Sequence, residues 1–175
     1  MHRNQIRRLT LTAMFIALGY LLPFLTGQIP QFGTMLSPMH IPALLCGFVC
    51  GWQYGLVAGA IMPLLRSATL GMPYIFPNAV AMAFELAAYG CAAGLLYRAL
   101  PKHIAFVYVT LVLSMLIGRA VWGLASAVLM MGTENAFTTQ AFLAGAFINA
   151  WPGIVLHILV IPPVVLGLRR AKLMD

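Results

Sequence analysis

Charged residues are scarce in this chain. Asp, Glu, Lys and Arg make up 7% of its 175 residues, and only three residues are acidic. A soluble domain has roughly a quarter of its residues charged. With 62% hydrophobic residues, the chain has too little polar surface to cover a globule in water. The low charge excludes an ordinary soluble domain and predicts an integral membrane protein.

Polar and apolar residues do not alternate along the hydrophobic stretches. Helices and closed barrels are the structures that satisfy the backbone inside a bilayer, and barrel strands alternate in polarity. Unbroken apolar runs therefore predict an all-α protein. No small-residue cleavage site follows the first run, so we expect it to be a span and not a signal peptide. The three cysteines (Cys46, Cys50 and Cys91) lie inside apolar runs, where packing is expected and a disulfide is not.

The net charge of +7 comes from basic residues whose placement does not suit a nucleic-acid surface. Eight of the ten flank the ends of apolar runs: Arg3, Arg7, Arg8, Arg98, Lys102, Arg169, Arg170 and Lys172. Cytoplasmic segments of membrane proteins carry this excess of Lys and Arg. Both termini and the Arg98–Lys102 connection are therefore predicted to lie inside, with no nucleic-acid partner.

Six apolar segments can be distinguished: Leu9–Thr26, His40–Gly51, Tyr54–Leu70, Phe76–Arg98, Ile104–Met130 and Phe142–Leu168. The second and third are short for spans, which need about 20 residues. An even number of crossings must separate Arg8 from Arg98, because charge places both inside. We therefore predict one membrane domain over residues 1–175, with six transmembrane helices and both termini cytoplasmic. The outer connections 27–38, 71–75 and 131–141 have no Lys or Arg and are predicted to act as lids.

Three ionisable residues lie within apolar sequence at outer-to-middle depth: Glu85, Arg119 and Arg66. At 1.5 Å per residue, Glu85 is ~14 Å and Arg119 ~16 Å from the outer ends of their segments. Charges at such depth usually face a cavity or a partner. Glu85 is expected to pair with Arg119 or Arg66. The second arginine is then left over, and a ligand carboxylate suits it; a purely structural tie or a snorkelling Arg66 remains the alternative.

Helical spacing adds polar neighbours to these charges. Asn78, Met82, Glu85 and Tyr89 share one helix face, and Met115, Arg119, Trp122 and Ser126 share another. Asn149 lies in the outer part of the last segment, and His40 and Tyr74 lie at the outer surface. His157 has no second metal ligand at a suitable spacing, so we assign no metal site. Neither a G-x-S-x-G motif nor a glycine-rich phosphate loop occurs, so we assign no catalytic residue, no cofactor and no bound ATP.

Small residues four apart recur in the first three segments, as Ala13/Ala17, Gly47/Gly51 and Gly55/Gly59. Such pairs let helix backbones approach closely. Residues 1–70 are therefore predicted to form helix contacts, and residues 71–175 to form a cavity.

The chain resembles the substrate-binding S components of energy-coupling factor (ECF) transporters. The resemblance rests on "RRLTLTAMFIALGYLLPF", with its Ala13/Ala17 pair, and on the long stretch from "MLSPMHIPALLCGF" to "AMAFELAAYG". It implies a vitamin-binding subunit whose first helices, through Ala13 and Ala17, dock on a transmembrane coupling protein carrying two cytoplasmic ATPases. It also implies a prokaryotic plasma membrane, a site near the outer face, and delivery by toppling of the whole subunit.

The stretch is most similar to pantothenate-type members, and a small monoanion suits one surplus arginine with Asn78, Asn149 and Ser126. Folate, cobalamin, hydroxymethylpyrimidine and riboflavin stay open, as do an intramembrane enzyme using Glu85 and a scaffold whose charges only tie helices. The substrate-binding candidates are Arg66, Asn78, Glu85, Arg119, Trp122, Asn149, His40 and Tyr74.

Overall fold

The computed structural model describes residues 2–26, 35–131, 138–171 and 174, and every regular element in these ranges is helical. The elements are α1 (His2–Leu21), η1 (Leu22–Thr26), α3 (His40–Cys50), α4 (Trp52–Leu70), η2 (Ile75–Ala79), α5 (Val80–Ala99), α6 (Ile104–Leu129), α7 (Thr139–Leu143), η3 (Ala144–Ile148) and α8 (Trp151–Arg170). The predicted all-α class is confirmed. The last apolar segment, predicted to start at Phe142, is helical from Thr139 onward, because α7 and η3 lead into α8.

Four helical stretches of the described ranges are long and apolar enough to cross a bilayer: Asn4–Leu25, Ile75–Ala99, Ile104–Leu129 and Thr139–Arg170. Helix α3 has 11 residues, about 16 Å at the helical rise. That is roughly half of a 30 Å hydrocarbon core. The predicted separation of residues 40–70 into two helices is correct, since Gly51 at φ 99° turns the chain between α3 and α4. The six-span count itself stays a prediction.

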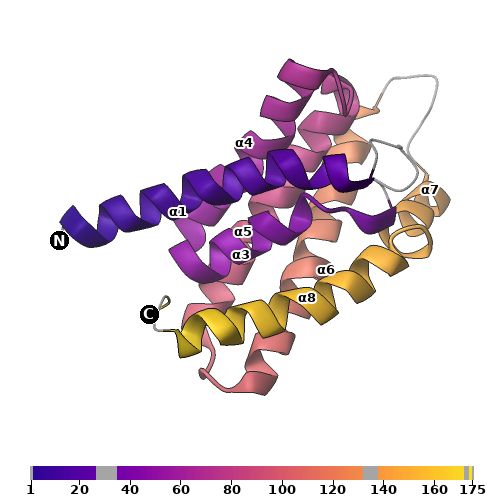
Figure 1. Ribbon diagram of the computed structural model, residues 1–175. Helices are drawn as coiled ribbons and strands as arrows, with labels where there is room; N and C mark the ends of the chain where they lie inside the picture. The colour runs from indigo at the N-terminus through magenta and orange to yellow at the C-terminus, as the bar shows by residue number, and fades with distance from the viewer. Residues whose placement is uncertain (1, 27–34, 132–137, 172–173, 175) are drawn as a thin grey trace.

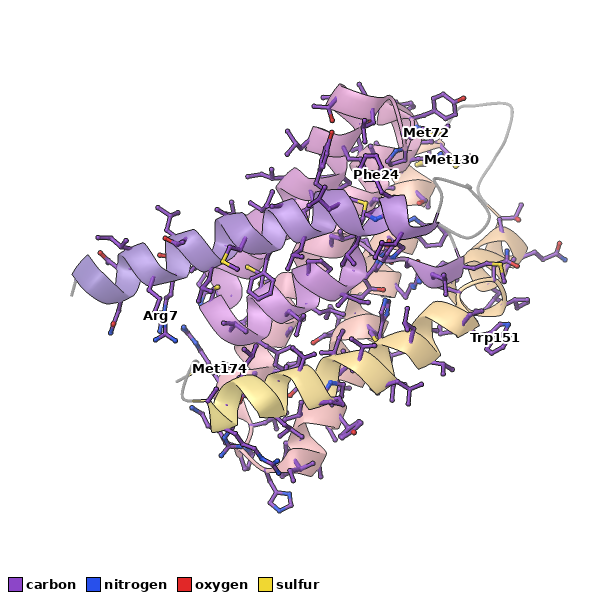
Figure 2. The ribbon with its side chains drawn as sticks, viewed as in Figure 1. Arg7, Phe24, Met72, Met130, Trp151 and Met174 are labelled. Atoms are coloured by element: carbon purple, nitrogen blue, oxygen red, sulfur yellow. The ribbon has the colours of Figure 1, made fainter. Side chains whose placement is uncertain are left out.

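Helix α5 is at the centre of the bundle and packs against α3, α4 and α6. Helix α1 lies across α3 and α4, while α8 contacts α3 and α6. Both termini lie toward one side of the bundle, and α7 lies toward the opposite side (Figure 1). Arg7 and Met174 mark the end with the termini, and Trp151 marks the other (Figure 2). The guanidinium of Arg169 also donates to the Lys102 carbonyl, so the α5–α6 connection belongs to the same basic end.

Glycines let α3, α4 and α5 meet backbone to backbone. A Cβ on Gly55 would overlap the Gly90 backbone, and a Cβ on Gly90 would overlap that of Gly55. Gly47 of α3 faces the same Gly90 carbonyl. The predicted close approach at Gly47 and Gly55 is therefore present. The partner of both glycines is Gly90 on α5, so the close contact joins the first segments to α5.

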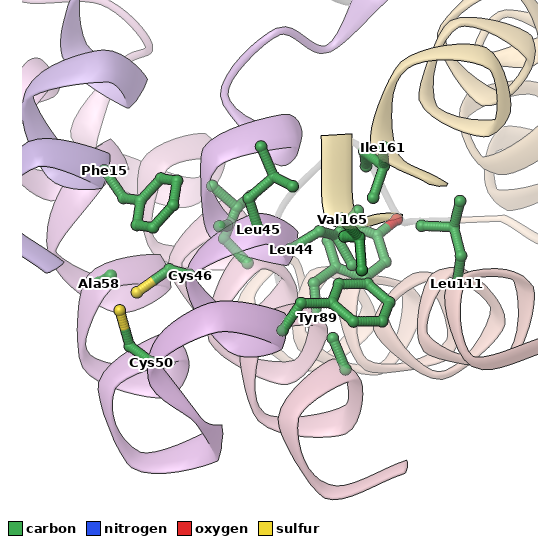
Figure 3. Packing of buried hydrophobic residues seen from close by; sticks show 14 of the residues in the cluster. Phe15, Leu44, Leu45, Cys46, Cys50, Ala58, Tyr89, Leu111, Ile161 and Val165 are labelled. Atoms are coloured by element: carbon green, nitrogen blue, oxygen red, sulfur yellow. The ribbon is translucent and has the colours of Figure 1, made fainter. Parts of the chain in front are cut away.

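The buried apolar core follows this contact (Figure 3). Phe15, Ala58 and the thiols of Cys46 and Cys50 lie at one end of the view, and Tyr89, Leu111 and Val165 lie at the other. All three cysteines are free, as expected. The core therefore extends from α1 through α3 and α5 to α6 and α8, which is the framework that holds the candidate site.

Candidate functional site

Glu85 of α5 is buried, with 2% of its side chain exposed, and its Oε1 atom has three polar neighbours. Arg119 Nη1 of α6 lies 3.0 Å away, so Arg119 is the partner of Glu85 among the two arginines that the sequence left open. The Tyr89 hydroxyl, one helical turn along α5, donates to the same oxygen at 3.0 Å. A buried carboxylate is stable only when it is paired and hydrogen-bonded. The Arg119 guanidinium therefore balances the charge of Glu85.

His40, the first residue of α3, is the third neighbour of Glu85. Its Nε2 atom lies 3.3 Å from Glu85 Oε1. The contact lacks hydrogen-bond geometry, and neither ring nitrogen has a hydrogen-bond partner in the part of the chain that the structure describes. The ring itself is 5.1 Å from that of Tyr89 and 5.8 Å, nearly parallel, from that of His157. His40 is therefore enclosed by the site, whereas the sequence had suggested a residue of the outer surface.

The short α3 explains how His40 reaches Glu85. Counted from the basic ends of their helices, His40, Glu85, Arg119 and His157 all lie about 15–22 Å along the axis at 1.5 Å per residue. A full-length span would have carried its first residue to the membrane surface, whereas α3 begins inside the bundle. Its packing on α5 and α8 then brings the imidazole against both helices.

A cavity of about 210 Å³ lies beside this cluster, between α5, α6 and α8 and next to η3. Arg119, Tyr89 and His157 supply its polar groups. The rest of the lining is apolar: Val112, Met115, Leu116, Phe147, Ile154 and Ile158. Pockets for drug-sized ligands run from about 300 to 1,000 Å³. This cavity suits a small solute with one anionic group, because its one full charge is a guanidinium.

Arg66 lies elsewhere. Its side chain is buried on α4, donates from Nη1 to the Tyr20 carbonyl at 3.0 Å, and stands 5.2 Å from the centre of the Phe24 ring. Thr69 and Tyr20 add a hydroxyl contact of 3.1 Å. Cations are favourable near helix carbonyls at a C-terminus and over aromatic faces. Arg66 thus ties the end of α1 to α4, and it is not among the residues that line the cavity.

The other predicted residues are not among those that line the cavity. Asn78, Tyr74 and Asn149 are exposed, Tyr74 to 72%. Trp122 stacks on Phe142 at 6.2 Å between ring centres. Asn78 lies in η2, the π-helical turn that precedes α5, and its side chain is exposed whereas that of Glu85 is buried. Of the connections predicted as lids, 71–75 is described, whereas most of 27–38 and 131–141 lies outside the described residues.

His157 is a site residue to which the sequence pattern assigned no role. Along the sequence no second metal ligand is spaced to join it, whereas the structure places it on the cavity and against His40 with 3% exposure. Its Nε2 atom has no hydrogen-bond partner within the described chain. The sequence held one signal for this role, a polar residue within the apolar stretch of α8. Ile154, His157 and Ile158 follow i, i+3, i+4 spacing, which places the three side chains on one helix face.

Ala13 and Ala17 lie on the exposed face of α1. Thr12, Phe15 and Gly19 form the opposite, buried face. The two alanines are therefore free for contact with a partner or with lipid, and they take no part in holding α1 to its own bundle.

A helical membrane bundle that holds a buried arginine against a small cavity is built as a receptor for a small solute. Comparison with protein families gives the particular class: residues 7–165 match the ECF transporter, substrate-specific component. The chain belongs to this family, and it is a multi-pass membrane subunit that binds the substrate of an ECF transporter. Members are transport subunits that partner with a transmembrane coupling component and ATPases. No curated protein and no solved structure matched the chain.

Proposed function

We propose that this subunit captures a small vitamin with one carboxylate from outside the cell, and that the carboxylate binds the Arg119 guanidinium in the cavity. The observation that carries the proposal is Arg119 itself: it is the cation among the lining residues, and it is held in place by Glu85 at 3.0 Å. Guanidinium groups bind carboxylates through two parallel hydrogen bonds.

Pantothenate is the first candidate among the vitamins. It is a monoanion whose geminal methyl groups suit the apolar wall of Phe147, Ile154 and Ile158, and whose hydroxyl and amide groups suit Tyr89 and His157. Folate carries a second carboxylate for which the lining offers no second cation, and cobalamin is far too large for about 210 Å³. Riboflavin and hydroxymethylpyrimidine have no carboxylate for Arg119.

The membrane topology and the partner subunits in this proposal are those that the family resemblance implies. The subunit has six spans in a prokaryotic plasma membrane with both termini in the cytoplasm. The shared basic end of the bundle supports the common side of the termini. Residues 1–70 would face the coupling protein through Ala13 and Ala17, and residues 71–175 would hold the substrate. The two ATPases of the complex hydrolyse ATP, and the loaded subunit topples to deliver its ligand.

Equilibrium binding of radiolabelled pantothenate to the purified chain tests the proposal. We expect saturable one-to-one binding that Arg119→Gln abolishes, whereas Arg170→Gln, an exposed arginine at the end of α8, leaves it unchanged. Unlabelled folate, riboflavin, hydroxymethylpyrimidine and cobalamin serve as competitors. Displacement by an uncharged vitamin at lower concentration than pantothenate would contradict the carboxylate assignment and leave the family assignment intact.

A further inference from the structure

We propose that the carboxylate ligand enters this site together with one proton, which His40 takes up. The inference rests on the proposed function, because it concerns the same Arg119 site. Its physical basis is the charge of the buried cluster and the unused hydrogen-bonding capacity of His40.

The charge count of the empty site is zero. Glu85 and Arg119 balance each other at 3.0 Å. We infer that the imidazoles of His40 and His157 carry no charge before the ligand binds. A bound carboxylate adds one negative charge to a region in which Glu85, His40 and His157 are each 2–3% exposed. An uncompensated buried charge is unfavourable, and titratable groups change protonation to avoid it. One added proton restores neutrality.

His40 is the group placed to accept that proton. Its Nε2 atom is 3.3 Å from Glu85 Oε1 without forming a hydrogen bond, and its Nδ1 atom is also unpaired within the described residues. Protonated imidazole donates from both nitrogens. When the ligand draws the Arg119 guanidinium toward the cavity, Glu85 is less fully neutralised. A protonated His40 then supplies the missing positive charge beside Glu85.

The titratable groups on neighbouring helices are less suited. Tyr89 of α5 already donates its hydroxyl proton to Glu85, and His157 of α8 lines the same cavity as the Arg119 guanidinium, which opposes a second positive charge there. Helices α1 and α4 also pack on α3. Their ionisable residues Arg66 and Tyr20 are occupied elsewhere, because the Arg66 guanidinium donates to the Tyr20 carbonyl. His40, between the Glu85 carboxylate and the His157 ring, is the favoured acceptor.

The complex then holds one proton more than the free protein and the free ligand together. Its dissociation constant therefore rises with pH, by at most about tenfold per pH unit for a single linked proton. Carboxylic acids of ordinary pKa, about 4, stay ionised above pH 6, so the ligand does not contribute to this slope.

Titration calorimetry of the full chain in detergent measures the proton directly. Binding of pantothenate, nicotinate and biotin is measured at pH 7.5 in phosphate and in Tris, whose heats of ionisation differ. We expect close to one proton taken up per ligand bound. A binding heat that does not depend on the buffer overturns the inference while the proposed function stands, and failure of all three carboxylates to bind overturns both.

Variants identify the group that takes up the proton. His40→Gln should reduce proton uptake to near zero and make affinity independent of pH, and His103→Gln, exposed in the α5–α6 connection, is the matched control that should retain one proton. Glu85→Gln is the second variant: Arg119 alone then neutralises the ligand, so uptake should also vanish. Full uptake in a folded His40→Gln or Glu85→Gln protein, or its loss in His157→Gln alone, overturns the assignment.

Discussion

The imidazoles of His40 and His157 stack inside the bundle, with ring centres 5.8 Å apart and planes inclined at 21°. The two residues come from α3 and α8, which are far apart in the sequence and pack against each other in the bundle. The stack joins the ionic cluster at Glu85 to the cavity that His157 lines. We therefore expect a ligand on Arg119 to perturb the surroundings of His40 as well.

Replacement of Arg119 by lysine should separate charge from geometry. Arg119→Lys keeps a cation near Glu85, so the fold should remain stable, but it removes the planar pair of donors that a carboxylate prefers. We expect pantothenate to bind at least about tenfold more weakly, a loss on the order of 1.4 kcal/mol. Radioligand binding and thermal unfolding in the same detergent measure the two effects. Equal affinity in the lysine variant would mean that a point charge is sufficient.

Arg66 should matter for stability and not for ligand affinity. Arg66→Gln removes a hydrogen bond from a charged donor to the Tyr20 carbonyl, which is worth about 1.5–3 kcal/mol. It leaves the cavity lining unchanged. We expect a lower unfolding temperature with the same pantothenate dissociation constant. A stable variant with lost affinity would instead place Arg66 in the binding site.

The backbone contact between α4 and α5 should not tolerate a methyl group. Gly90→Ala places a Cβ on the Gly55 backbone, and overpacking of this kind costs about 1–3 kcal/mol or more. Gly167→Ala is the matched control, because nothing among the described residues lies within 4 Å of its Cβ position on α8. Thermal unfolding should show a large decrease for the first variant alone. Equal unfolding temperatures would refute the close approach of the helices.

Filling the cavity should block the ligand without disturbing the ionic cluster. Ile158→Phe adds volume on the lining, whereas Leu159→Phe, one residue along α8, points outward and is 67% exposed. Pantothenate binding should be lost in the first variant and kept in the second, with both proteins folded by size-exclusion chromatography. Undiminished binding to Ile158→Phe would show that the ligand occupies another place.

The exposed alanines of α1 should act in assembly alone. The double variant Ala13→Leu, Ala17→Leu changes a face that makes no contribution to the buried core, so ligand affinity should stay the same. Copurification with the coupling component should fall sharply, since leucine prevents close helix approach. Ala120→Leu on the exposed face of α6 is the control. Normal copurification of the double variant would assign the contact to another surface.

Much of the architecture could be predicted because bilayer physics leaves few choices. Low charge and long apolar runs predicted the all-helical class, and the glycine spacing of Gly47 and Gly55 predicted backbone contact. Paired buried charge is nearly obligatory in a membrane protein, so Glu85 within an apolar run was enough to indicate a cationic partner. Which of two arginines it would be was open, since both had suitable depth.

The sequence alone determined that this is a helical membrane protein and that a carboxylate deep in it needs a cation. Only the tertiary structure decided that Arg119 meets Glu85 while Arg66 binds the end of α1, and that His40 and His157 meet beside the cavity. The reason is that hydropathy and charge fix where a residue lies along its helix, whereas rotation about the axis and the starting depth of a short helix such as α3 are set by packing against the neighbours. The candidate site depends on both.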